Sequence, residues 1–197
     1  MNHVAETILQ LKNISKSFGV VKALKNVDLE LKKGEVHALV GENGAGKSTL
    51  MKILTGVYTK DSGQIIYDGK EVEFSKPKDA MDAGISIVHQ ELNMMSDLTI
   101  AQNIFIGRET IKHKIFTDDR DIENKTRELF KLFNIEINPN LIVGDLTVGE
   151  QQMVEIVKAI SMDAKIIIFD EPTAALTENE AENLFKIIDR LKKRGVT

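Results

Sequence analysis

The alternation of apolar and polar residues predicts β-structure at the start of the chain. Within residues 1–35, apolar and polar residues alternate in the stretches TILQLKNI and NVDLELKKGE. The second stretch also contains Lys-Lys-Gly, which is typical of a turn. Further along, SGQIIYDGKEVEF is typical of a hairpin that turns at Asp68-Gly69. We therefore expect an antiparallel β subdomain at the N-terminus.

Three short apolar runs predict buried strands, namely EVHALVG, GISIVHQ and AKIIIFDEP. The last run has no polar alternation, as is typical of a strand buried on both faces of a parallel sheet. The first run ends at Gly41 in a glycine-rich loop, and the helical pattern STLMKILTGV follows it. Strands that alternate with helices in this way indicate an α/β core.

Helical patterning dominates from about residue 91 to residue 162, which predicts a mainly helical insert in the core. Inside it, LTVGEQQ marks a helix start, because Thr147 can cap the helix and Glu150 completes a capping box. After the last apolar run, TENEAENLFKIIDRLKKRG predicts an amphipathic helix whose acids come first and whose bases come last.

The composition excludes several classes of protein and several kinds of site. The 197 residues are enough for one domain, and the net charge of -4 gives no reason to expect nucleic acid as a ligand. The absence of Cys excludes disulfides and thiolate metal sites. The start MNHVAETILQ lacks the pattern of a signal peptide, and no apolar run approaches the roughly 20 residues of a membrane span.

The stretch GENGAGKST, residues 41–49, fits the phosphate-loop pattern G-x-x-x-x-G-K-[ST]. Its glycines permit backbone conformations in which successive N–H groups point at one anion, and the following helix adds its positive end. We expect Lys47 to reach the β- and γ-phosphates and Ser48 to bind Mg²⁺. The nucleotide-binding candidates here are Gly41, Asn43, Gly44, Ala45, Gly46, Lys47, Ser48 and Thr49.

Two adjacent acids end the run IIIFDE. Asp170 lies at the end of the predicted strand, where an α/β sheet binds its ligands, and is a candidate Mg²⁺ carboxylate. Glu171 follows it and can polarise an attacking water, an effect of about 10²–10⁴ in rate. A solvated acid at a strand end is the alternative for Glu171.

The order of GENGAGKST, VHQE, LTVGEQQ and IIIFDEPTAALT resembles the nucleotide-binding domain of ATP-binding cassette (ABC) transporters along essentially the whole chain, residues 1–197. The resemblance implies a P-loop NTPase fold with a mostly parallel sheet, an N-terminal antiparallel β subdomain and a mainly helical insert. It also implies ATP and Mg²⁺ as cofactors and ATP hydrolysis as the activity. In this family two such domains face each other head to tail.

Several residue roles follow from this resemblance alone. LTVGEQQ looks like the signature motif that contacts the ATP held by the other domain, which assigns nucleotide contacts to Thr147, Val148, Gly149 and Glu150. Phe18 matches the aromatic residue that stacks on adenine. Gln90 matches the glutamine that joins the Mg²⁺ site to the helical insert and assists catalysis, with Glu171 and Lys47. Thr177 replaces the usual Asp of the loop AALT, which puts the coupling role of that loop in doubt.

One expected residue is missing from the pattern. The family places a switch histidine after a further strand, whereas His3, His37, His89 and His113 lie elsewhere in the sequence. The resemblance therefore implies a piece of a longer protein, truncated before that histidine, whose own hydrolysis is slow.

The stretches HQELNMMSDLTIAQNIFIGRE and EPTAALTENE are similar to the first cassette of bacterial importers of monosaccharides such as ribose, galactose and xylose. This narrower resemblance implies a second ATP-binding cassette, membrane permease subunits and, indirectly, an extracytoplasmic sugar-binding protein as partners. It implies a cytoplasmic location on the inner face of the membrane. The alternatives are a soluble ABC-type ATPase that acts on ribosomes or DNA, and a GTPase switch, although no N-K-x-D stretch is present.

Overall fold

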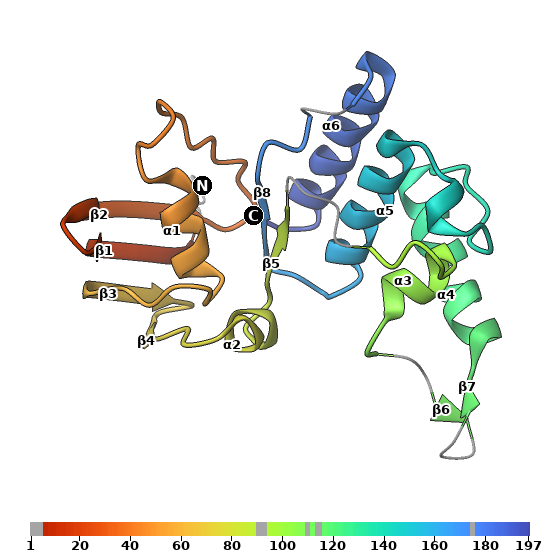
Figure 1. The fold of residues 1–197 in the computed structure, drawn as a ribbon, viewed down its shortest axis with the longest axis horizontal. Helices are drawn as coiled ribbons and strands as arrows, with labels where there is room; N and C mark the ends of the chain where they lie inside the picture. The colour runs from red at the N-terminus through yellow and green to blue at the C-terminus, as the bar shows by residue number, and fades with distance from the viewer. Residues whose placement is uncertain (1–5, 90–93, 109–110, 113–115, 174–175) are drawn as a thin grey trace, which may run out of the picture. The chain divides into compact units, whose positions relative to one another are not determined.

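The computed structural model describes residues 6–89, 94–108, 111–112, 116–173 and 176–197 (Figure 1). The chain divides into two compact units. The first unit comprises Met1–Ser86, Ala164–Ile168 and Leu191–Thr197, and the second comprises Ile87–Asp163 and Phe169–Arg190.

A four-stranded antiparallel sheet is the centre of the first unit. It is formed by β1 (Thr7–Phe18), β2 (Val21–Lys32), β3 (Ser62–Tyr67) and β4 (Lys70–Val72), in the order β2-β1-β3-β4. The turn between β3 and β4 uses Asp68 at φ 50° and Gly69 at φ 75°, as the Asp-Gly pair predicts. The predicted N-terminal β subdomain and its hairpin are therefore confirmed.

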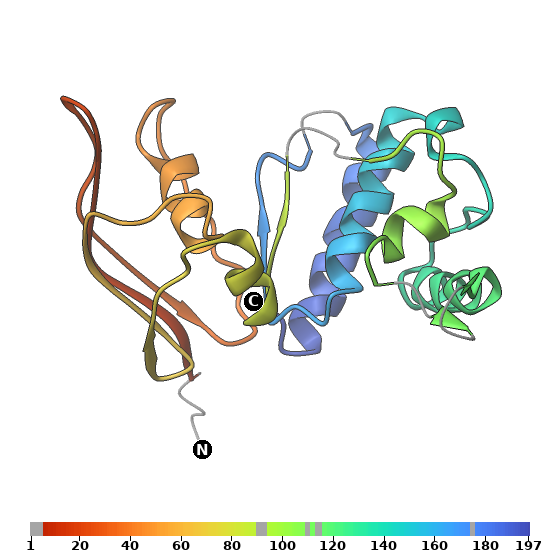
Figure 2. The ribbon, with the colours of Figure 1, turned by 60° about the horizontal axis from the view of Figure 1, so that its bottom comes forward.

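Two helices of the first unit lie between its strands in the sequence, α1 (Lys47–Leu54) and α2 (Pro77–Asp82). Figures 1 and 2 show α1 alongside the sheet, and its apolar residues belong to the same core as those of the strands. The packing of α1 against the sheet fixes the start of this helix, which follows the phosphate loop directly. Fully buried members of this core include Leu9, Leu11, Ile14, Ile53 and Ile65.

Two of the three predicted buried strands are present. They are β5 (Ile85–Val88) and β8 (Ile166–Phe169), which pair as a two-stranded sheet. The prediction of a buried strand over EVHALVG is wrong, because residues 35–41 form no strand. In this segment the side chains of Val36, Leu39 and Val40 are 61%, 37% and 88% exposed.

The backbone hydrogen bonds of Thr197 explain why residues 35–41 do not pair with β8. The N–H of Ile167 donates to the Thr197 carbonyl at 2.8 Å, and the N–H of Thr197 donates to the Lys165 carbonyl at 2.9 Å. Thr197 therefore occupies the pairing positions on this part of β8. The N–H of Gly34 donates to Thr197 Oγ1 at 3.0 Å, so the segment after Gly34 starts beside Thr197 rather than on β8. Apolar character alone does not make a strand without a free partner edge.

Helices dominate the second unit. They are α3 (Ile100–Phe105), α4 (Asp119–Phe133), α5 (Val148–Ile160) and α6 (Glu178–Lys193), with a 3₁₀ turn at Val143–Asp145 and the two-residue strands β6 (Ile111–Lys112) and β7 (Phe116–Thr117). The boundaries 91–162 that the sequence suggests for a helical insert stay a prediction. A separate apolar core lies among α3, α4 and α5, and it includes Ile100, Ile104, Phe130, Val154 and Val157.

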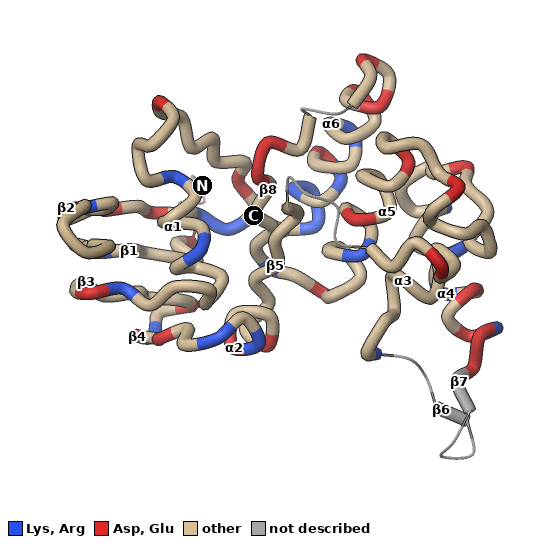
Figure 3. The backbone as a smooth tube through the Cα atoms, in the orientation of Figure 1, with Lys and Arg blue, Asp and Glu red and all other residues tan. Residues whose placement is uncertain are grey.

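The helix starts in this unit match their sequence signals. Thr99, Asp118 and Thr147 cap α3, α4 and α5 with side-chain hydrogen bonds. The predicted capping box of Thr147 and Glu150 is confirmed. In α6 acidic residues come first and Lys192 and Lys193 come last (Figure 3), as the helix dipole favours. No helix in the described part of the chain combines the length and apolar character that crossing a membrane requires.

Candidate functional site

The phosphate-loop residues 41–49 lie in the first unit, where they run into α1. Gly44 and Gly46 adopt φ values of 83° and 90°, a region that residues with side chains rarely enter. A Cβ atom at Gly46 would lie 2.6 Å from the carbonyl oxygen of Ala23, so this position accepts only glycine. The backbone of the loop is therefore held against β2 in the bent form that an anion-binding nest needs.

Lys47 closes this loop with its ammonium group. Its Nζ donates to the carbonyl oxygen of Gly41 at 2.6 Å and to that of Glu42 at 3.0 Å. The N-cap residue of α1 is Gly46, so this helix has no side-chain cap, unlike α3, α4 and α5. An anion at this start would satisfy the first N–H groups of α1 and meet the ammonium group of Lys47. The residues present thus fit a phosphate group.

The other residues of the motif are placed consistently with this geometry. Asn43, Gly44 and Ala45 are exposed in the loop, and so is Ser48 in the first turn of α1. Thr49 is half-buried beside it. An exposed hydroxyl at Ser48, beside Lys47, is an oxygen ligand of the kind that Mg²⁺ prefers.

Phe18 ends β1 in the same unit, and its side chain is 41% exposed. Its ring meets that of Tyr58 edge to face, with the centroids 5.1 Å apart. Tyr58 follows α1 closely, and Lys52 of α1 lies with its Nζ 5.4 Å from the Tyr58 ring. The sequence gives no signal for Tyr58, but its contact ties Phe18 to the helix that begins at the phosphate loop.

Asp61 anchors the end of β1 next to Phe18. Its carboxylate accepts hydrogen bonds from Lys16 Nζ at 2.8 Å and from the N–H of Ser17 at 2.7 Å. These bonds, first the one from Lys16, hold the pKa of Asp61 below its usual value. Because the folded state lowers this pKa, the anchor is present above the ordinary Asp range and is lost as the pH falls through the lowered value.

Replacing Phe18 with Ala is expected to weaken ATP binding about tenfold, since loss of a stacking aromatic costs about 1–3 kcal/mol per base. Binding of tripolyphosphate, which has no base, should hardly change. Titration of both ligands measures the difference, and Phe185→Ala serves as control because Phe185 is a 59% exposed residue of α6. Equal weakening for both ligands would contradict the assignment of Phe18 to the base.

The acidic pair lies in the second unit, directly after β8. The N–H of Asp170 donates to the carbonyl oxygen of Val88 at 3.1 Å, which extends the contact between β8 and β5. Asp170 is half-buried and Glu171 is exposed. The β5 pairing thus fixes the backbone at Asp170, which leaves its carboxylate on a rigid support at a strand end.

Glu171 has an uncommon backbone conformation, with φ at 49°. Among the described non-glycine residues with positive φ, the other five are Asn or Asp, which tolerate this region better than Glu. A left-handed residue breaks the strand alternation that would point Asp170 and Glu171 in opposite directions. Strain of this kind costs about 1–3 kcal/mol and is concentrated at functional positions.

The signature-like residues form the start of α5, also in the second unit. The N–H and hydroxyl of Thr147 donate to Glu150 Oε2 at 2.8 and 3.0 Å, and the N–H of Glu150 donates to Thr147 Oγ1 at 3.2 Å. Gln151 Nε2 donates to the carbonyl oxygens of Val143 and Leu146 at 3.2 and 3.1 Å. Gln151 thus fastens the preceding turn to α5, while Val148 is 54% exposed at the helix start.

Several predicted positions fall outside the described residues or stand apart from these groups. Gln90 lies outside the described residues, as do His3 and His113. His37 precedes the phosphate loop, and its Nδ1 lies 3.4 Å from Glu35 Oε1. The structure brings Phe18 and residues 41–49 into one unit, and it brings Asp170, Glu171 and residues 147–150 into the other.

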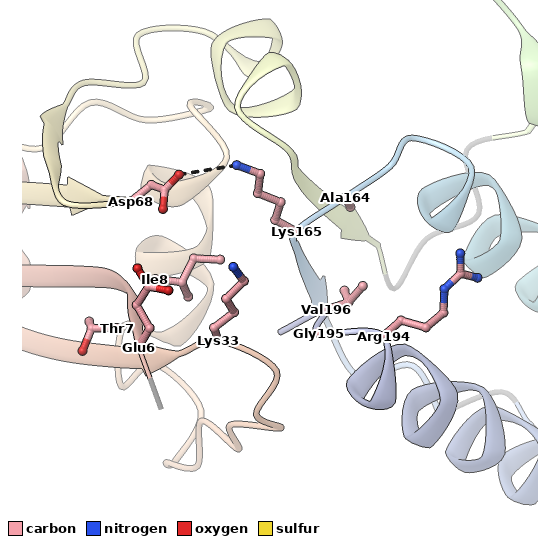
Figure 4. Close-up of a pocket in the computed structure, with 10 residues that line it drawn as sticks. All are labelled: Glu6, Thr7, Ile8, Lys33, Asp68, Ala164, Lys165, Arg194, Gly195 and Val196. Atoms are coloured by element: carbon pink, nitrogen blue, oxygen red, sulfur yellow. Dashed lines mark ion pairs between the residues drawn. The ribbon is translucent and has the colours of Figure 1, made fainter. Parts of the chain in front are cut away.

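A pocket of about 250 Å³ opens elsewhere in the first unit, and no residue from 41–49 lines it (Figure 4). Lys165 Nζ and Asp68 Oδ2 form an ion pair at 3.5 Å across it, and Glu6 and Lys33 add one charge of each sign. Arg194 adds a third basic residue, so three basic residues face two acidic ones and the lining is only weakly positive, too little to balance a triphosphate.

Known proteins are similar to this chain in sequence and in fold. A putative ribose/galactose/methyl galactoside import ATP-binding protein of Geobacillus kaustophilus is 52% identical over 191 residues, which are 96% of this chain and 38% of that protein. The chain thus spans well under half the length of this relative.

Two solved structures are similar as well. A nucleotide-free ATP-binding cassette from an ABC transporter matches with a TM-score of 0.85 and 28% identity, over 97% of this chain and 79% of that one. A dimeric ATP-binding cassette bound to ADP and Pi in a post-hydrolysis state matches with a TM-score of 0.80 and 26% identity, over 96% and 85%. Residues 24–174 match the family described as ABC transporter, and the chain therefore belongs to the ABC transporter family of ATP-binding proteins.

Proposed function

We propose that this chain is the ATP-binding and ATP-hydrolysing part of an importer of ribose- or galactose-type monosaccharides. The phosphate loop carries this proposal, because Lys47 and an uncapped α1 start converge on residues 41–46. The name of the Geobacillus kaustophilus relative, an import ATP-binding protein, supports the sugar class.

The proposed reaction assigns one role to each candidate residue. The backbone N–H groups of residues 43–49 and the ammonium group of Lys47 bind the phosphates, and Phe18 stacks on the adenine. Mg²⁺, when bound through Ser48, Asp170 and Gln90, neutralises charge on the phosphate oxygens. Glu171 orients and polarises the attacking water. The mostly parallel core sheet that the sequence suggests is part of this proposal.

A second cassette completes the arrangement. In the proposed dimer, Thr147, Val148, Gly149 and Glu150 of one cassette face the nucleotide held by the other. The similarity to a cassette solved as a dimer with ADP and Pi supports this step. Closure of the dimer can drive transport only because ATP binds the closed state more tightly than the open one.

The remaining parts of the proposal are permease subunits that contact the second unit, an extracytoplasmic sugar-binding protein that acts through them, and a cytoplasmic position on the inner face of the membrane. The alternative is a soluble ABC-type ATPase that acts on ribosomes or DNA. The net charge of -4 disfavours it, because nucleic-acid binding normally needs a basic surface.

Affinity purification from detergent-solubilised cells of the source organism separates these functions. If the chain serves transport, the tagged protein should retain a polytopic membrane protein and no RNA after washing with buffers to which no nuclease is added. Recovery of ribosomal RNA or DNA, with no membrane protein retained, would instead support the alternative. A vector-only preparation from the same cells is the control.

A further inference from the structure

Gly149 in the first turn of α5 is buried, although its neighbours Thr147 and Val148 are exposed. Its φ is not in the left-handed region, so its backbone would accept an alanine without strain. The space for a Cβ atom is filled instead. The three atoms that a Cβ on Gly149 would meet are Cδ, Oε1 and Oε2 of Glu180, and the Cβ would overlap them.

Glu180 is held in this place by hydrogen bonds from the start of its own helix, α6. Its Oε2 accepts from the N–H of Thr177 and from Thr177 Oγ1, both at 2.8 Å. The N–H of Glu180 donates back to Thr177 Oγ1 at 3.4 Å. Thr177 and Glu180 therefore form a capping box of the same T-x-x-E type as Thr147 and Glu150 of α5.

The two helix starts thus meet through one carboxylate. Glu180 caps α6 and, against Gly149, places a negative charge beside the N-terminus of α5, where the helix dipole favours an anion. Because Thr177 follows Glu171 by six residues, Glu180 also connects the segment after the acidic pair to the start of α5.

We infer that Glu180 is a positioning residue that fixes the start of α5 relative to the start of α6, and that Gly149 lacks a side chain to make room for its carboxylate. The catalytic part of this inference rests on the proposed function, in which the start of α5 faces the nucleotide of a second cassette. The packing part concerns this chain alone. Glu180 acts through Thr177 and Gly149 and does not touch the nucleotide.

A carboxylate is the flexible end of its side chain, so a Cβ at position 149 would displace it rather than block folding. The displaced Glu180 would lose both bonds from Thr177. Gly149→Ala and Glu180→Ala should therefore remove the same contact. Each is expected to lower the Tm by about 2–4 °C, the shift typical of losing one cap in a chain of this size.

The double variant Gly149→Ala/Glu180→Ala tests this directly. It should have the Tm of Glu180→Ala alone, or a higher one, because alanine at position 149 then fills the space that the carboxylate has left. Glu180→Gln keeps the shape and one acceptor oxygen, so it should stay within about 1 °C of the unmodified chain. Gly149→Ala/Glu180→Gln should fall to the Tm of Gly149→Ala. Glu182→Ala, which changes another exposed acid of α6, is the control.

The catalytic readout separates positioning from general destabilisation. Glu180→Ala should lower kcat several-fold while the Kd of this chain for MgATP stays within about twofold, since Glu180 is not among the residues assigned to the nucleotide or to Mg²⁺. The packing inference is overturned if the Tm losses of Gly149→Ala and Glu180→Ala add in the double variant, or if Gly149→Ala has no effect. Unchanged kcat in Glu180→Ala overturns the catalytic part. Failure of the unmodified chain to bind MgATP would refute the proposed function. The Tm comparison would still show whether Gly149 and Glu180 share one contact.

Discussion

Replacing Lys47 with Ala is expected to weaken MgATP binding by roughly 100-fold. Its ammonium group already bonds two loop carbonyls, at 2.6 and 3.0 Å, and a bound phosphate would offer it charged oxygens in the same place. Hydrogen bonds to charged groups contribute about 1.5–3 kcal/mol each, and 1.4 kcal/mol corresponds to a factor of ten. Isothermal titration with MgATP at a fixed salt concentration measures the loss.

Lys78→Ala provides the matched control for this experiment. Lys78 is an exposed lysine of α2 in the same unit, so its removal changes the net charge equally without touching the loop. The control should bind MgATP as the unmodified chain does. If Lys47→Ala binds MgATP as tightly as Lys78→Ala, residues 41–49 are not the phosphate site.

Replacing Glu171 with Gln is expected to lower ATP turnover by about 10²–10⁴ while MgATP binding is retained. Glutamine has the shape of the native side chain but cannot polarise water as a carboxylate does. Because ATP then persists, the variant should accumulate as an ATP-bound dimer. Both effects are measured in a chain extended far enough to carry the switch histidine, by steady-state phosphate release and by size-exclusion chromatography with MgATP. The parent of the same length is the reference.

Glu178→Gln is the control for this second prediction, because Glu178 is an exposed acid seven residues further along, in the first turn of α6. Its turnover should equal that of its parent. A Glu171→Gln protein that stays monomeric with normal turnover would refute the catalytic assignment, and the φ of 49° at this residue would then need another explanation.

Local signals were sufficient for most of the elements and for the bent conformation of the glycine-rich loop. The Asp68-Gly69 turn, the box of Thr147 and Glu150, and the order of charges in α6 each depend on residues a few positions apart. Interactions of this range are encoded in the sequence pattern itself. The same holds for residues 41–47, whose glycines and lysine act through the backbone that connects them.

Contacts between distant residues could not be predicted in this way. The run EVHALVG has the composition of a strand, but pairing needs a partner edge. At the start of β8, the backbones of Lys165 and Ile167 are bonded to Thr197. Tyr58 lies 40 positions from Phe18 in the sequence, and no periodicity joins them. Such partners are set by the tertiary fold, which overrides local preference.

The absence of a side chain at Gly149 has two separate explanations. The resemblance to ABC cassettes assigns Gly149 a contact with the ATP held by another cassette. The structure adds a second reason within the chain, because the carboxylate of Glu180 occupies the space of the Cβ. Glu180 is 31 positions away, so only the packing of α5 and α6 in the second unit reveals the contact.

A crystal structure of the Glu171→Gln protein grown with MgATP would show whether residues 41–49 hold the nucleotide. We expect triphosphate density on the N–H groups of residues 43–49, with Mg²⁺ bound by Ser48 and Asp170. We also expect residues 147–149 of a second copy at the γ-phosphate. Nucleotide bound away from residues 41–49, or no nucleotide at millimolar MgATP, would contradict the proposed phosphate site.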